Sequence, residues 1–241
     1  MAVEAAVARA RPSASIDRLF YSGMALAILA VVFVGFAPSY YLKGYFQGKP
    51  LPWILHAHGA VFTSWILLFA VQATLIAKRR VDLHRRLGVA GAILAAALVA
   101  IGLTAARWAV KRDVAAGQEG ALSFLAIPFG DMLVFLLLAG AGILYRRQPE
   151  THKRLMLLAT ISILSAAFAR WPFSIGAAGP IAFFGLPDLL VATGAVYDVF
   201  SRGRVHPAYI WGGLLLFASQ PLRLALGQTH AWTTFARIVI G

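Results

Sequence analysis

The sequence predicts an all-α integral membrane protein with seven transmembrane helices, and three observations support that prediction. Hydrophobic residues make up 60% of the 241 residues, charged residues only 13%, and the mean hydropathy is +0.77. This composition lies outside the range of soluble globular domains. Apolar runs long enough to span a membrane, which takes about 20 residues, follow one another with short connections. The basic residues gather mainly in those connections.

The seven expected spans follow the apolar runs. They cover about residues 20–41, 51–77, 87–108, 122–145, 154–171, 181–200 and 209–226. Pro38 and two tyrosines close the first span, and Pro172 stops the fifth, because proline does not continue a helix. The sixth is the least hydrophobic, since Asp188 lies inside it. We therefore expect a basic cytoplasmic segment at residues 1–19, a transmembrane domain at 20–226 and a short amphipathic tail at 227–241.

The amino end is basic and precedes an apolar run, which is also the pattern of a signal peptide. The run continues without a convincing small-x-small cleavage site and is long enough to span, so we expect a retained first helix. The net charge of +13 would suggest nucleic-acid binding in a soluble protein. Here orientation and anionic lipid head groups explain it better, and nucleic acid is not an expected partner.

The positions of the basic residues predict an N-in, C-out topology in a bacterial cytoplasmic (inner) membrane. With this orientation most of the 22 Lys and Arg residues lie on the cytoplasmic side, as the positive-inside rule requires. The tryptophans at 53, 108, 171 and 232 all fall at the outer interface, as an aromatic belt should. The topology makes three hairpins, from the second and third, fourth and fifth, and sixth and seventh helices, each with its basic turn inside.

A short motif recurs in the hairpin turns. It reads DLHRRL at residues 82–87 and ETHKRL at 150–155, with a weaker echo, RVHP, at 204–207. Its histidines, His84, His152 and His206, each begin the second helix of a hairpin. We expect the three to lie at similar depth near the cytoplasmic head groups.

A transmembrane haem b needs two neutral imidazoles on facing helices at equal depth, and His84 and His152 meet the depth requirement. The acidic residue two positions before each could orient its ring. Alternatively, these histidines cap helices or touch lipid phosphate beside their arginines. A metal site of His84, His152 and His206 is a further alternative, although the nearby cations would oppose a divalent metal. The chain has no cysteine, which excludes disulfides and thiolate metal sites.

His58, Trp65 and Gln72 recur every seven residues on the second helix. We expect this polar stripe to face the bundle, with His58 as a ligand, a proton-transfer group or a hydrogen-bonded packing residue.

Charged residues in the outer third of the spans form a second candidate site. Charges inside a membrane are usually paired or functional. The four are Asp131, Arg170, Asp188 and Arg223. They predict either ion pairs that clamp neighbouring helices or a polar outer cavity that takes a small solute, a lipid or a quinone head group. At the other end of the sixth helix, Tyr197 and Asp198 are expected at the interface.

Two runs, LHAHGAVFTSWILLFAVQATLIAKRRVDLHRRLG at residues 55–88 and ETHKRLMLLATISILSAAFARWP at 150–172, resemble a group of uncharacterised bacterial polytopic membrane proteins. That group pairs a His-Gly helix and a His-Arg-x-Leu-Gly turn with a later helix opening on His-Lys-Arg-x-Met. The resemblance implies the fold and no activity. A looser likeness is to b-type transmembrane cytochromes, although the fourth helix has no histidine to face His58.

Three hypotheses of function follow, and the sequence assigns no reaction. Phosphate-binding loops, dinucleotide-binding glycine patterns, nucleophile elbows and zinc-protease motifs are missing. The first hypothesis is a redox or haem-binding protein, associated with quinone or with a respiratory or photosynthetic complex. The second is a lipid- or small-solute-binding or transport protein that uses the outer polar cavity. The third is a structural subunit of a larger membrane complex.

Overall fold

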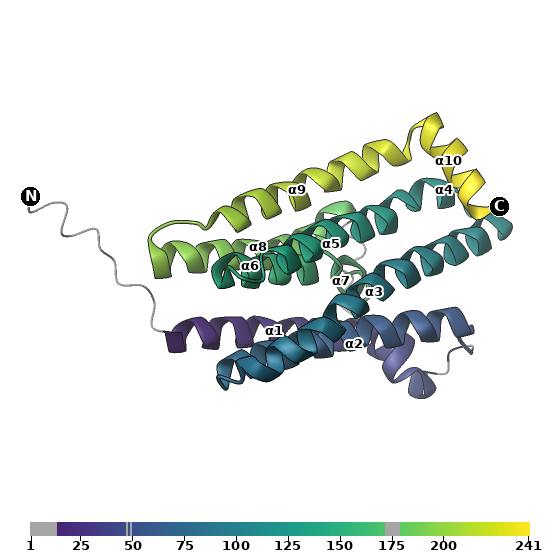
Figure 1. The fold of residues 1–241 in the computed structure, drawn as a ribbon. Coiled ribbons are helices and arrows are strands. Elements are labelled where there is room, and N and C mark those ends of the chain that lie inside the picture. Colours follow the sequence, from purple (N-terminus) through teal and green to yellow (C-terminus); the bar gives the residue numbers. More distant parts are fainter. Residues whose placement is uncertain (1–13, 47, 49, 172–178) are drawn as a thin grey trace, which may run out of the picture.

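Every regular element in the described part of the chain is a helix. The computed structural model describes residues 14–46, 48, 50–171 and 179–241. The long helices run side by side in a bundle, and a last short helix lies across one end (Figure 1). The elements are α1 (Ala14–Phe36), η2 (Ala37–Tyr41), η3 (Lys43–Phe46), α2 (Trp53–Ala77), α3 (Val81–Ala115), α4 (Ala121–Phe124), α5 (Ala126–Leu144), α6 (Pro149–Ile161), α7 (Ser165–Phe168), α8 (Gly179–Arg202), α9 (Pro207–Gly227) and α10 (His230–Ile240).

Among the residues that the structure describes, five helical stretches are long and apolar enough to cross a membrane. They are Ser15–Tyr41, Trp53–Ala77, Val81–Ala115, Ala121–Leu144 and Phe183–Arg202. The all-helical class with several membrane-length helices is thus confirmed, whereas the count of seven spans stays a prediction. Of the expected boundaries, the segment 1–13 and Pro172 lie outside the described residues.

The fifth and seventh expected spans, which correspond to α6 with α7 and to α9, are not among these five stretches. α6 has 13 residues, a length of about 20 Å at 1.5 Å per residue, which is shorter than the hydrocarbon core of a bilayer at about 30 Å. A turn separates it from the short α7. α9 has 21 residues and carries Gln220, Pro221 and Arg223 in its last turns.

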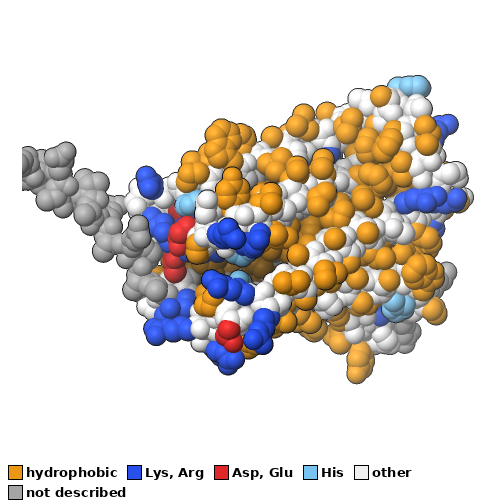
Figure 2. Space-filling model, in the orientation of Figure 1, with side chains coloured by type: hydrophobic (Ala, Val, Ile, Leu, Met, Phe, Trp, Pro, Cys, Tyr) orange, Lys and Arg blue, Asp and Glu red, His pale blue; other side chains and the backbone are white. Residues whose placement is uncertain are grey.

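The core is built around α6, which contacts α5, α8 and α9. Leu157, Leu158 and Ile161 have no exposed surface, and Arg154 is equally buried. The flanks of the bundle are different, since they expose many large apolar side chains, such as Leu189 at 61% and Leu222 at 66%. Figure 2 shows hydrophobic side chains over the flank and charged ones gathered towards the ends. This distribution is that of a bundle surrounded by hydrocarbon.

The turn between α2 and α3 is tight and basic. Arg79 has a φ of +60°, and the amide of Arg80 donates to the carbonyl of Leu75 at 2.8 Å. A left-handed residue followed by a backbone bond that reaches back five residues is a common way to end an α-helix. The turn brings α3 back along α2, so that His84 lies in the first turn of α3.

Candidate functional site

His84 and His152 come together at the end of the bundle that carries the basic turns. Both lie in the first turn of their helices, α3 and α6, and the first turn of α6 begins with Pro149, which favours a helix start. Their ring centroids are 6.1 Å apart, and the ring planes are nearly perpendicular at 86°. The two histidines are therefore neighbours in the structure, and their depth in a membrane stays a prediction.

One of the two imidazoles has a fixed tautomer. His152 Nδ1 lies 2.8 Å from the carbonyl oxygen of Gly142 on α5. Because a carbonyl only accepts hydrogen bonds, Nδ1 carries the proton and Nε2 keeps its lone pair. Metal-binding histidines are commonly oriented in this way, by a carbonyl on the other ring nitrogen.

The surroundings of His84 contain unpaired polar atoms. Gln72 on α2 donates from Nε2 to the backbone carbonyl of His84 at 3.1 Å. The other amide atom, Gln72 Oε1, and His84 Nδ1 are both buried and have no hydrogen-bond partner in the described structure. Since buried polar atoms nearly always have partners, these two mark a place where a further group or water belongs.

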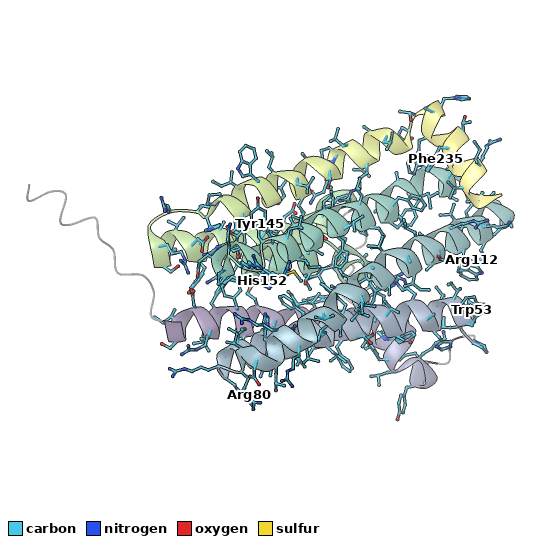
Figure 3. All side chains as sticks on the ribbon, viewed as in Figure 1. Trp53, Arg80, Arg112, Tyr145, His152 and Phe235 are labelled. Carbon is cyan, nitrogen blue, oxygen red and sulfur yellow. The ribbon has the colours of Figure 1, made fainter. Side chains whose placement is uncertain are left out.

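The rim around the histidine pair is strongly basic. Its exposed cations come from the second turn of α3 and from the connection between α5 and α6. They are Arg85, Arg86, Arg146 and Arg147. Figure 3 places His152 and Arg80 at this end of the bundle and Arg112, Trp53 and Phe235 at the opposite end. The rim therefore suits a ligand with negative charges.

His206, the third histidine of the repeat, caps a helix and does not join the pair. Its Nδ1 accepts a hydrogen bond from the amide of Ala208 at 3.1 Å and so caps α9. Its own amide donates to Asp198 at 3.0 Å. In the described residues no group of three or more His, Asp and Glu side chains is placed to hold a metal ion. The three-histidine metal site considered from the sequence is not assembled.

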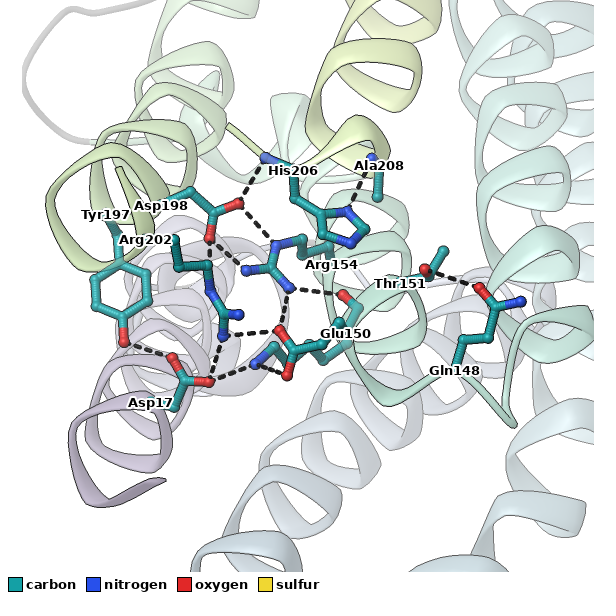
Figure 4. Close-up of polar contacts among 11 residues, drawn as sticks. Asp17, Gln148, Glu150, Thr151, Arg154, Tyr197, Asp198, Arg202, His206 and Ala208 are labelled. Atoms are coloured by element: carbon teal, nitrogen blue, oxygen red, sulfur yellow. Dashed lines mark hydrogen bonds and ion pairs between the residues drawn. The ribbon is translucent and has the colours of Figure 1, made fainter. Parts of the chain in front are cut away.

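Beside the histidine pair lies an ionic network that joins α1, α6 and α8 (Figure 4). Its centre is Arg154, which donates from Nε to Asp198 at 2.8 Å and from Nη2 to the other oxygen of the same carboxylate. Arg154 also bonds to the Glu150 carboxylate at 2.8 Å. Asp17 accepts from Lys153 at 2.6 Å and from Arg202 at 2.8 Å. With three cations and three anions, the network is neutral.

Asp198 was expected at the interface, but its side chain is fully buried. It lies within an apolar run of α8, and its partner Arg154 is 44 residues away. The sequence offered half of the signal, because Glu150 and Arg154 stand four apart on one helix, a spacing that favours an ion pair.

Burial and the charges of the network shift the pKa of two groups at this end, Glu150 and His206. Burial opposes the ionisation of Glu150, but hydrogen bonds from Arg154 and Lys153 outweigh it and lower its pKa. Burial and the charge of Arg154 lower the pKa of His206, which therefore stays neutral and can accept the bond that caps α9.

The four charges of the predicted outer site do not form one cluster. Arg223 on α9 pairs with Asp131 on α5 through Nη1. Asp188 on α8 instead accepts from Gln220 at 2.7 Å. Arg170 donates to the carbonyl of Ala166 at 2.6 Å, and its guanidinium lies 4.9 Å from the centre of the Phe36 ring.

The three residues of the polar stripe on α2, His58, Trp65 and Gln72, make different contacts. His58 stacks on Phe62 with ring centroids 4.0 Å apart, and its Nδ1 is buried without a hydrogen-bond partner in the described structure. Trp65 is buried and donates to Thr160 on α6 at 3.3 Å. Gln72 is the residue that reaches the His84 carbonyl. Trp65 and Gln72 therefore face other helices, whereas the ring contact of His58 is with Phe62 of the same helix.

The chain was compared with protein-family models, with curated proteins and with solved structures. No protein-family model matches the chain, and neither does a curated protein or a solved structure.

Proposed function

We propose that this chain is a seven-pass protein of the bacterial cytoplasmic membrane that binds one haem b between α3 and α6. His84 and His152 would hold it through their imidazole nitrogens. Bound haem exchanges single electrons, so the protein serves as an electron carrier. The observation that supports this best is the pairing of two imidazoles from corresponding positions of two hairpins.

The spacing of the rings suits a metal between them. A first-row metal binds an imidazole nitrogen at about 2.0 Å, so two opposed nitrogens are about 4 Å apart and their ring centroids about 6 Å. The centroids of His84 and His152 are 6.1 Å apart. Each ring can rotate about its own bond to the metal, so the perpendicular ring planes are compatible with the same coordination. The Gly142 carbonyl would hold His152 with its Nε2 towards the metal.

The neighbouring residues suit the rest of the haem group. Gly88 follows His84 by one helical turn, and a Cβ there would have only the Gln72 amide within 4 Å, at 3.8 Å. Met156 follows His152 by one turn and is a flexible side chain that adapts to a bound group. The two haem propionates would pair with the exposed arginines of the rim, since guanidinium groups bind carboxylates well.

The proposed topology puts this site at the cytoplasmic interface. The amino terminus is cytoplasmic, the basic turns lie inside, and α6 with α7 and α9 provide the two passes beyond the five membrane-length helices. The propionates would then reach the water and head-group layer while the ring lies in hydrocarbon. The excess of Lys and Arg in the turns at this end supports the orientation.

The absorption spectrum of the purified protein tests the proposal. Wild-type protein, expressed with a haem precursor, should show the bands of a reduced b-type haem at about one haem per chain. His84→Ala and His152→Ala should each lose them, because a six-coordinate haem needs both imidazoles. His56→Ala is the matched control, since His56 is exposed on α2 and outside the pair, and it should keep the bands. A colourless wild-type protein, or bands unaffected by both substitutions, would refute haem ligation by this pair.

A further inference from the structure

A long apolar groove lies between α3, α5 and α9 and ends at α10. Its volume is about 740 Å³. On α9 its lining extends from Trp211 to Leu226, and at 1.5 Å per residue this is a length of about 22 Å. α10 crosses from the end of α9 to the end of α3 (Figure 1) and contributes Trp232 and Phe235 to the lining. Such a groove fits a hydrocarbon chain.

The polar part of the groove lining is a pair of neighbouring side chains on α9, Ser219 and Arg223. Arg223 donates from Nε to the Ser219 carbonyl at 3.2 Å, from Nη2 to the Ser219 hydroxyl at 2.7 Å, and from Nη1 to Asp131. A guanidinium has five N–H groups, so Nη1 and Nη2 each keep one for a further acceptor.

Gly130 is what lets the arginine cross α5. A Cβ at Gly130 would stand 2.8 Å from the Cδ and Nε atoms of Arg223, so a larger residue would displace the side chain. The charge of Arg223 is balanced by Asp131, and the pair is therefore neutral. An uncharged acceptor matches this position better than an anion does.

Aromatic rings gather where the groove meets α10. Phe129 lies 6.3 Å from Trp232 and 6.4 Å from Phe235, and Trp232 lies 5.2 Å from Phe235, measured between ring centroids. All three line the groove. Rings of this kind stack favourably on a flat, unsaturated group.

We propose that the groove binds an isoprenoid quinone. Its flat, uncharged head would lie against the surface that Phe129, Trp232 and Phe235 present to the groove, with a carbonyl oxygen accepting from Arg223. Its apolar tail would run along α9 towards Trp211. A phospholipid fits less well, because its phosphate would leave the head-group layer to meet a guanidinium that Asp131 has already neutralised. The inference does not depend on the haem.

Titration with decylubiquinone, read as quenching of tryptophan fluorescence in detergent, tests the proposal. Wild-type protein should show saturable quenching. Ala218→Phe fills the groove and should weaken binding by about tenfold or more, a change of about 1.4 kcal/mol. Ala192→Phe adds the same ring to an exposed position of α8 outside the groove and should bind like the wild type.

Three results would overturn the inference. They are quenching that rises without saturation, equal affinities in the two phenylalanine variants, and a co-purified phospholipid that decylubiquinone does not displace from the groove. A Phe129→Leu variant, which keeps an apolar side chain but removes one ring, should also bind more weakly. The fluorescence signal needs no haem. A failure of quinone binding is therefore distinguishable from a missing haem spectrum.

Discussion

At the scale of single residues, Arg79 is in a conformation that its side chain disfavours. Its φ is +60°, and a side chain in this left-handed region costs about 1–2 kcal/mol, which glycine avoids. Arg79→Gly should therefore raise the stability of the protein by about 1 kcal/mol, measured as thermal unfolding in detergent. Arg79→Ala removes the same charge and keeps the Cβ, so it should bring no such gain. Equal gains in both variants would show that charge, not backbone strain, is responsible.

The sequence predicted the residues of the histidine pair better than those of the ionic network. A repeated motif puts His84 and His152 in the first turns of two helices, and the structure brings their rings together. Nothing local indicates that Asp198 pairs with Arg154, because this contact depends on how α8 packs against α6. The outer charges show the same limit, since residue type did not reveal that Asp188 bonds to Gln220 and Asp131 to Arg223.

At the scale of the helices, α1 and α7 approach so closely that only glycine fits between them. A Cβ at Gly35 would stand 2.2 Å from the carbonyl oxygen of Ala167, a backbone atom that cannot turn aside. Gly35→Ala should destabilise the protein by about 1–3 kcal/mol through overpacking. Gly23→Ala, in the same helix with nothing within 4 Å, should be neutral or slightly stabilising. Thermal unfolding of both variants tests this, and similar losses in the two would contradict the close contact.

The positions of the helices were predictable from the sequence, but their lengths and surroundings were not. The expected second span at 51–77 corresponds to α2, and the third at 87–108 lies within the longer α3. Hydropathy does not distinguish a helix that faces lipid from one that is enclosed by other helices. The apolar second half of α6 is enclosed by α5, α8 and α9, so it needs no membrane length to bury its side chains.

At the scale of the whole molecule, the two candidate binding sites lie towards opposite ends of an apolar bundle. One end holds the histidine pair, the basic rim and the ionic network. The other holds α10 and the aromatic end of the groove. The charge pattern of the turns predicted the first end. The groove was beyond prediction, because it forms where α3, α5, α9 and α10, which are far apart in the chain, meet side by side.

The ionic network should make the stability of the whole bundle depend on pH. The pKa of His206 is below its ordinary value of 6.5 in the folded protein. The unfolded chain therefore binds more protons when the pH falls below about 6.5, and stability is lost in that direction. Arg154 and Glu150 from α6 and Asp198 and Arg202 from α8 face this histidine. The folded pKa of Glu150 is also lowered, so its contribution is lost only below about pH 4.5.

Acidification from pH 7.5 to 5 should therefore lower the thermal unfolding temperature mainly through His206. Protonation removes the lone pair with which Nδ1 accepts from the Ala208 amide, and the cap of α9 is lost. His206→Asn keeps a side-chain acceptor that caps helices well but does not titrate. Its unfolding temperature should fall less over this range than that of the wild type. Parallel curves for the two proteins would assign the acid sensitivity to other groups, and an unchanged wild type would show that the neutral cap contributes nothing measurable.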